Sequence, residues 1–168
     1  GDLSVESAIS EKGGISLTAI TGDLAVESAE AQEDITLVAE TRNVNVDNVK
    51  SELGAITMTA QGTVDVNGAV SHTGNISITS NTSHVTLQTA TAGANVTITA
   101  QNDVLVGTVT SEGGSVHLTA TGNLAVESAE AQEDITLVAE TGNVNVDDVT
   151  SELGAITMTA QGTVDVNG

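Results

Sequence analysis

The 168-residue chain contains no cysteine, proline, phenylalanine, tryptophan or tyrosine. Without cysteine, no disulfide can stabilise the fold, which is compatible with an exported protein that does not rely on disulfides. Without aromatic side chains, we expect a thin core built from stacked aliphatic residues. Proline would delete a hydrogen bond from any strand that is paired on both sides, so its absence fits a continuous sheet.

Basic residues are also scarce, since Lys12, Arg42 and Lys50 stand against 23 acidic residues and give a net charge of -20. A chain of this charge repels polyanions, which excludes nucleic acid and anionic membranes as partners and makes cations the natural counterparts. Three scattered bases cannot form the basic cluster that an enzyme acting on acidic sugars needs. The sequence also has no Gly-x-Ser-x-Gly turn and no Ser/His/Asp grouping. We therefore expect a protein that is not an enzyme and has no catalytic residues.

Aliphatic residues recur along the chain with a period near twenty. The first set of positions is Leu3, Leu24, Val44, Val64, Val85, Val104, Leu124, Val144 and Val164, each followed two residues later by Val or Leu. The second set is Ile15, Ile35, Ile56, Ile76, Val96, Val116, Ile135 and Ile156, each followed by Leu, Ile or Met and then by Ala or Ser. A third apolar position, expected to start a short third face, is occupied by Ala8, Ala29, Val49, Val70, Ala90, Val109, Ala129 and Val149.

This period predicts an all-β fold of the solenoid type, a parallel β-helix with about 20 residues per coil and about eight coils over residues 1–168. Alternation within each set places the aliphatic side chains on one face of a short strand. Such strands cannot form a stable sheet alone, so equivalent residues of successive coils must stack. We therefore expect a single rod-shaped segment in which Leu24, Val44 and Val64 form one buried file.

A longer repeat overlies the short one. Residues 22–68 recur at 122–168 with four differences, which are Asp23 to Asn123, Arg42 to Gly142, Asn48 to Asp148 and Lys50 to Thr150. The unit is thus 100 residues, or five coils, and near-identity suggests a recent duplication. Duplication in whole coils lengthens a rod without changing its cross-section. The chain begins and ends inside its own pattern without a cap, so we expect further coils or a partner at both ends.

The repeated stretches Gly122-Asn-Leu-Ala-Val126 and Gly74-Asn-Ile-Ser-Ile-Thr79 resemble the shaft repeats of filamentous haemagglutinin-type bacterial surface adhesins. The resemblance covers the whole chain. It implies a right-handed parallel β-helix of roughly triangular section that is exported to the cell surface and serves as a stalk for adhesion or biofilm formation. The acidic loops and the near-perfect 100-residue unit depart from that family's pattern.

The acidic residues of the repeated coils are the candidate metal ligands. The candidates for calcium are Glu27, Glu30, Glu33 and Asp34, with Glu127, Glu130, Glu133 and Asp134 in the second copy. Oxygen ligands at this density could hold calcium between adjacent coils. The spacing matches neither the nine-residue glycine-aspartate repeat nor an EF-hand. The favoured interpretation is instead a hydrated acidic band that keeps the rod soluble.

Threonine and serine occupy the outward positions of the second set, as in the pairs Ser16 and Thr18, or Thr57 and Thr59. A flat threonine array can match an ice lattice, as in β-solenoid antifreeze proteins, although Val38, His117 and Val138 interrupt it here. Threonine is also simply a favourable outward residue in a strand. Ice binding is therefore the less favoured interpretation.

Taken together, the sequence predicts a structural segment of an extracellular or cell-surface fibre or adhesin stalk. Its partners would be further copies of itself, end to end or side by side, and a host or matrix surface. Calcium is the one cofactor that the sequence suggests. A calcium-stiffened surface or biofilm matrix module and an ice-binding solenoid are the alternatives.

Overall fold

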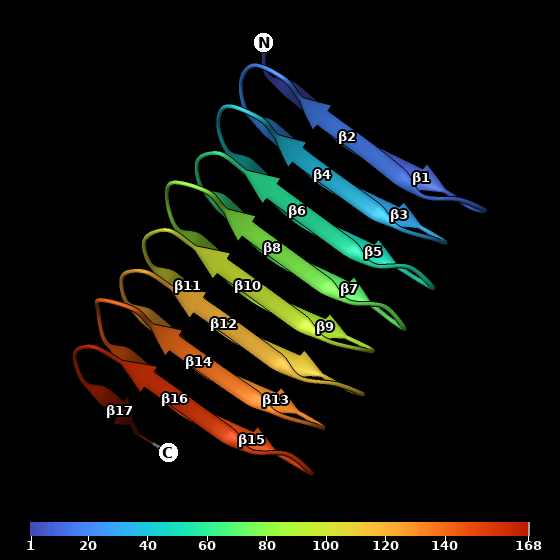
Figure 1. The fold of residues 1–168 in the computed structure, drawn as a ribbon. Helices are drawn as coiled ribbons and strands as arrows, with labels where there is room; N and C mark the ends of the chain where they lie inside the picture. Colours follow the sequence, from blue (N-terminus) through green and yellow to red (C-terminus); the bar gives the residue numbers. More distant parts are fainter. Residues whose placement is uncertain (168) are drawn as a thin grey trace.

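The computed structural model describes residues 1–167, which form strands joined by short bends and wind into a rod (Figure 1). The nine odd-numbered strands of this part are β1 Leu3–Ser10, β3 Leu24–Ala31, β5 Val44–Ser51, β7 Val64–Ser71, β9 Val85–Ala92, β11 Val104–Ser111, β13 Leu124–Ala131, β15 Val144–Ser151 and β17 Val164–Val166. The eight even-numbered strands there are β2 Ile15–Ala19, β4 Ile35–Ala39, β6 Ile56–Ala60, β8 Ile76–Ser80, β10 Val96–Ala100, β12 Val116–Ala120, β14 Ile135–Ala139 and β16 Ile156–Ala160. Within residues 1–167, no helix is long and apolar enough to span a membrane.

The odd-numbered strands form one parallel sheet and the even-numbered strands form another, each in chain order. Leu24 pairs with Val44, and Val44 pairs with Val64. All three side chains are fully buried, so they form the single file that the sequence predicts. The predicted β-solenoid is therefore confirmed, and its roughly eight coils make a rod of about 40 Å at the usual strand spacing.

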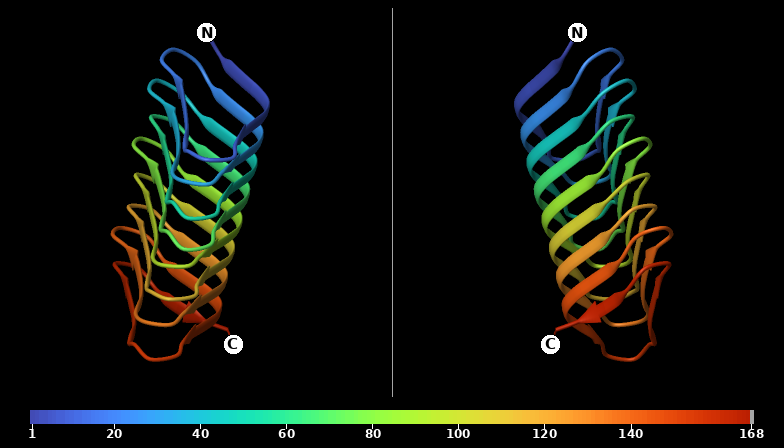
Figure 2. Two further views of the ribbon diagram at one scale, coloured as in Figure 1. Left: turned by 90° about the vertical axis from the view of Figure 1, so that its right-hand side faces the viewer. Right: turned by 90° about the vertical axis from the view of Figure 1, so that its left-hand side faces the viewer.

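The coil is right-handed and has three sides. In Figure 1 the even-numbered strands run from right to left in front, and the odd-numbered strands return behind them as the chain descends. Residues 24–26 form one side, residues 28–31 the second and residues 35–39 the third. Figure 2 shows that successive coils keep the same outline along the rod. The handedness and roughly triangular section implied by the resemblance are thus confirmed.

The third face belongs to the odd-numbered strands and is not a separate element. Two consecutive outward residues, Glu27 and Ser28 in β3, bend the strand before alternation resumes at Ala29. One predicted core residue is wrong. In β7 the buried side chain is Ala69, which pairs with Val49, whereas Val70 faces outward. The buried residue lies five positions after the start of the strand, as Val49 does in β5, and choosing the larger aliphatic side chain one residue later gives the wrong assignment.

A small inward residue precedes each bend between an odd-numbered strand and the next even-numbered strand. Where it is serine, four residues follow before the next strand, and where it is alanine, only three follow. The serines are Ser10, Ser51, Ser71, Ser111 and Ser151, and the alanines are Ala31, Ala92 and Ala131. The buried Ser51 hydroxyl accepts a 3.0 Å hydrogen bond from the Gly54 N–H and donates one of 2.8 Å to the Glu33 carbonyl of the previous coil. The serine thus satisfies backbone groups that the longer bend leaves without a ladder partner.

Candidate functional site

Two surface features of the rod could carry function: the acidic residues around the bends, and the serine and threonine face of the even-numbered strands. None of the even-numbered strands contains an acidic residue. The carboxylates of this strongly acidic chain therefore lie on the odd-numbered strands and in the bends.

Two of the predicted calcium ligands, Asp34 and Asp134, accept hydrogen bonds from the backbone. Asp34 Oδ1 accepts a 2.8 Å hydrogen bond from the N–H of Ala55, and Asp134 Oδ1 accepts one of 2.7 Å from Ala155. Asn75 uses its side-chain oxygen in the same way toward Asn95, at 2.9 Å. Asparagine and aspartate share this position, so these hydrogen bonds between coils need a side-chain oxygen acceptor and do not need a negative charge.

A similar ladder runs along the bends that follow the even-numbered strands, interrupted between Thr63 and Asp103. Its donor N–H and acceptor Oδ1 pairs are Asp23 to Asp2, Asn43 to Asp23, Thr63 to Asn43, Asn123 to Asp103, Asn143 to Asn123 and Thr163 to Asn143. Sequence reasoning missed both ladders. The signal that could have revealed them is the recurrence of Asp or Asn immediately before a strand.

The other predicted ligands lie apart from these aspartates. Glu27 and Glu127 lie at the bend within β3 and β13, and both are exposed. Glu30 and Glu130 face outward at the next-to-last position of the same strands. Glu33 and Glu133 lie in the following bend with exposed side chains, and their carbonyls accept the hydroxyls of Ser51 and Ser151.

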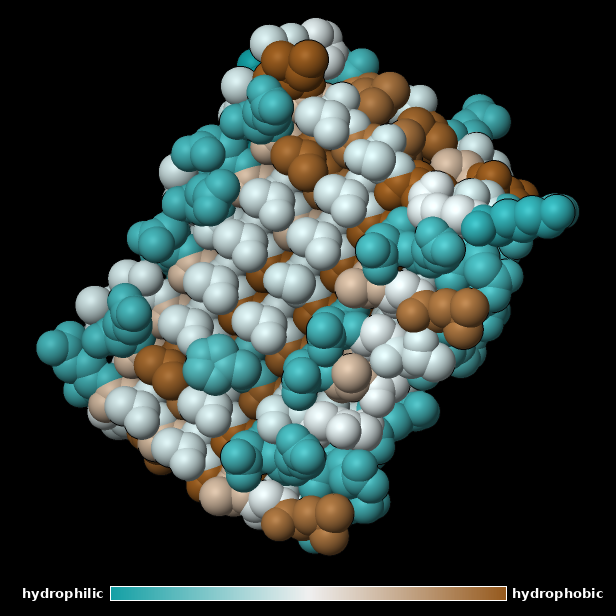
Figure 3. Space-filling view, turned by 45° about the vertical axis from the view of Figure 1, so that its right-hand side comes forward, coloured by the Kyte–Doolittle hydropathy of each residue, from teal (hydrophilic) through white to brown (hydrophobic). Residues whose placement is uncertain are grey.

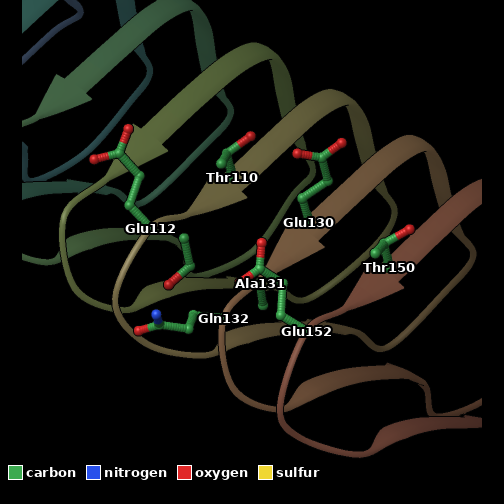
Figure 4. Close-up of a pocket in the computed structure, with 8 residues that line it drawn as sticks. Thr110, Glu112, Glu130, Ala131, Gln132, Thr150 and Glu152 are labelled. Atoms are coloured by element: carbon green, nitrogen blue, oxygen red, sulfur yellow. The ribbon is translucent and has the colours of Figure 1, made fainter.

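Glu130 lines a shallow hollow of about 250 Å³ formed by three successive coils (Figure 4). Glu112 and Glu152 line the hollow from the two neighbouring coils, and Gln132 lines it from the same coil as Glu130. The physical cause of the hollow is the short bend that follows Ala131, since the bends above and below have one more residue each. The shorter coil recedes between its neighbours. Sequence reasoning did not predict this hollow, because it depends on the difference between adjacent bends.

The equivalent hollow at Ala31 has a volume of about 170 Å³ and contains a basic residue. Lys50 Nζ lies 2.7 Å from Glu52 Oε1, and His72 Nδ1 lies 3.3 Å from Glu52 Oε2. The pKa of Glu52 is lowered, first by the hydrogen bond from Lys50 and further by the positive charge of that residue. The pKa of Lys50 is raised by the same hydrogen bond.

Within residues 1–167, no group of three or more histidine, aspartate or glutamate side chains is arranged to hold a metal ion. The structure thus does not bring the eight predicted ligands together as one cluster. It places Glu30 and Glu130 in the hollows and uses Asp34 and Asp134 in the backbone ladder. Calcium binding remains a prediction.

The even-numbered strands present the second feature, a flat face with two outward residues per strand (Figure 3). These residues are Ser16, Thr18, Thr36, Val38, Thr57, Thr59, Ser77, Thr79, Thr97, Thr99, His117, Thr119, Thr136, Val138, Thr157 and Thr159. All but three carry a hydroxyl group. Their strands pair in register, so equivalent hydroxyls stack in two files along the rod. This face has the geometry that the sequence predicts for the threonine array.

No family model matches the chain, and no curated protein or solved structure matches it either. The resemblance to filamentous haemagglutinin-type repeats therefore rests on the sequence motifs alone.

Proposed function

We propose that the chain is a structural segment of an extracellular or cell-surface fibre or adhesin stalk. The observation that carries this proposal is the in-register stack, in which each described coil repeats the cross-section of the one before it. A rod of this kind provides reach and stiffness, and its length can change without a change in its core.

The two copies of residues 22–68, the second at 122–168, support this interpretation. The four positions that differ between them, Asp23, Arg42, Asn48 and Lys50, are all exposed or half-buried in the first copy. None lies in the core. The repeated coils therefore have identical core residues and differ only at surface positions, as expected if a fibre is lengthened in whole coils.

Rod length tests the structural part of this proposal. We expect that inserting one further copy of residues 22–121 lengthens the particle by about 24 Å, five times the usual strand spacing. Small-angle scattering or atomic force microscopy measures this increment. A particle that becomes thicker or globular instead of longer would contradict the stalk. Labelling of intact source cells with an antibody against the chain tests the proposed location, because an internal protein would be labelled only after lysis.

Ice binding is a second candidate function, which the flat files of hydroxyl groups favour. Val38, His117 and Val138 interrupt these files and weaken the match to a lattice. Thermal hysteresis in a cooling assay would establish ice binding, whereas a stalk produces none.

A further inference from the structure

We propose that the serine and threonine face of the even-numbered strands is a lateral docking surface for a second copy of this chain. This inference rests on the proposed fibre function and assigns side-by-side association to one face of the rod. The face consists of the sixteen outward residues between Ser16 and Thr159 that are named above.

The distribution of charge selects this face. The chain carries a net charge of -20, yet the even-numbered strands contain no acidic residue. His117 is the one titratable side chain on this face, and it contacts the Thr119 hydroxyl at 3.1 Å. Contact through either of the other two sides would bring carboxylates of both rods together, which is unfavourable. The uncharged face is therefore the side through which two copies can approach with the least repulsion along the whole rod.

The position of the acidic residues makes the association dependent on salt. Glu33 and Glu40 lie in the bends at the two edges of the face, so some repulsion persists when two faces meet. The Debye length is about 8 Å at physiological ionic strength and about 30 Å at 0.01 M. Added sodium chloride should therefore strengthen the pairing by screening charges at the rim and on the outer sides.

The repeat of the face favours a second copy as the occupant. Thr59, Thr79 and Thr99 stack at the strand spacing, and a partner that matches them over many rungs needs the same spacing. A second copy of this solenoid has the same spacing, because its strands stack in the same way. Small side chains without charge allow two such sheets to approach closely over their whole length.

The area of the face predicts a weak contact for this segment and a stronger one for a longer rod. Eight strands of five residues cover about 600 Å² per rod, or about 1,200 Å² in a pair. That value lies at the lower limit for specific interfaces. Five further coils would enlarge the same contact without a new type of interaction. We expect this longer rod to have an association constant about tenfold higher or more.

Sedimentation of the full 168-residue chain over a range of concentrations tests the proposal. We expect reversible association that increases with sodium chloride. The double variant Thr59→Glu and Thr99→Glu places one carboxylate on each of two rungs and should lower the association constant by about tenfold or more, because like charges would face each other across the contact. The matched control, Thr91→Glu and Thr108→Glu, adds the same charge to outward threonines of the odd-numbered strands. We expect it to associate nearly as the unchanged chain does.

Cross-linking locates the contact even if the glutamate variants fold poorly. Because the chain has no cysteine, Thr79→Cys and Thr91→Cys each introduce a single thiol. With a short bis-maleimide, Thr79→Cys should give covalent dimers at concentrations where Thr91→Cys gives few. Equal yields, or equal weakening by both glutamate pairs, would contradict the assignment of the face.

Two further outcomes would overturn the proposal in favour of another occupant. If the chain stays monomeric at all concentrations and shows thermal hysteresis that the Thr59→Glu and Thr99→Glu variant loses, the face binds ice. Association that a calcium chelator abolishes would place the contact on the acidic sides. Neither result affects the rod-length experiment, so failure of lateral pairing is distinguishable from failure of the fibre proposal.

Discussion

The hydroxyl of Ser51 accepts a 3.0 Å hydrogen bond from the backbone N–H of Gly54, three residues further along the bend. The same hydroxyl donates to a carbonyl of the previous coil, so one buried side chain links two coils and closes the turn. Ser71 and Ser111 make the same pair of bonds in their own bends. The choice between serine and alanine at this position is therefore coupled to the length of the bend.

Removal of the Ser51 hydroxyl should destabilise the rod. We expect Ser51→Ala to lower the free energy of unfolding by about 1–3 kcal/mol, because the Gly54 N–H and the Glu33 carbonyl lose their partner in a buried bend. Urea unfolding followed by circular dichroism measures this change.

The reciprocal substitution, Ala31→Ser, provides the matched control. In the shorter bend a serine hydroxyl would be buried without the residue that donates to it in the longer bends, so we expect this variant to be destabilised as well. If Ser51→Ala were neutral or Ala31→Ser stabilising, the coupling between side chain and bend length would be incorrect.

The role of Asp34 can be separated from calcium binding by an isosteric change. We expect Asp34→Asn to retain stability, since asparagine keeps the oxygen that accepts the Ala55 N–H, as Asn75 does in its own coil. Asp34→Ala removes that acceptor and should lower the free energy of unfolding by about 1 kcal/mol. Thermal melts in calcium-containing buffer compare the two variants. A large loss in Asp34→Asn would instead indicate that the negative charge holds a cation.

Chelation tests the calcium alternative directly. If the acidic residues form only a hydrated band, sodium chloride and calcium chloride at equal ionic strength should raise the melting temperature equally, because both screen the same repulsion. A chelator should then leave the melting temperature unchanged. A fall of many degrees on addition of the chelator would support a calcium-stiffened module.

The sequence was sufficient to predict the coils, the register and the files of aliphatic residues, because alternation and a fixed period of about twenty determine them. It predicted the third face but assigned Val70 to the core in place of Ala69, because Val is the larger aliphatic residue and the constant offset from the strand start, which Val49 also has, was not applied there. The ladders at Asp34 and Asn43 were not predicted, because they depend on contacts between neighbouring coils that are visible only when the bends are superposed. The hollow at Ala131 was missed for the same reason.

The stacked core predicts a strong contrast between inward and outward aliphatic residues of similar size. Ile78 is fully buried, whereas Leu105 is 53% exposed on an odd-numbered strand. We expect Ile78→Ala to lower the free energy of unfolding by about 2–5 kcal/mol, because the neighbouring coils cannot collapse onto the cavity. Leu105→Ala should have a much smaller effect. Urea unfolding of both variants measures the difference, and similar losses would contradict the assignment of the two faces.

The ion pair between Lys50 and Glu52 gives a prediction for pH. The hydrogen bond from Lys50 lowers the pKa of Glu52, so its contribution to stability is present above the usual glutamate pKa and disappears as the pH falls through the lowered value. The pKa of Lys50 is raised, so its contribution disappears only as the pH rises through that higher value.

Lys50→Thr, the change that the second copy carries at Thr150, tests this pair. We expect the pKa of the Glu52 carboxyl, followed by NMR titration, to return toward its ordinary value in this variant. The free energy of unfolding should scarcely change, because both partners are exposed and water screens their attraction. A Glu52 titration that is the same with and without Lys50 would show that the pair does not persist in solution. A large loss of stability would mean that Lys50 acts through a contact other than this exposed pair.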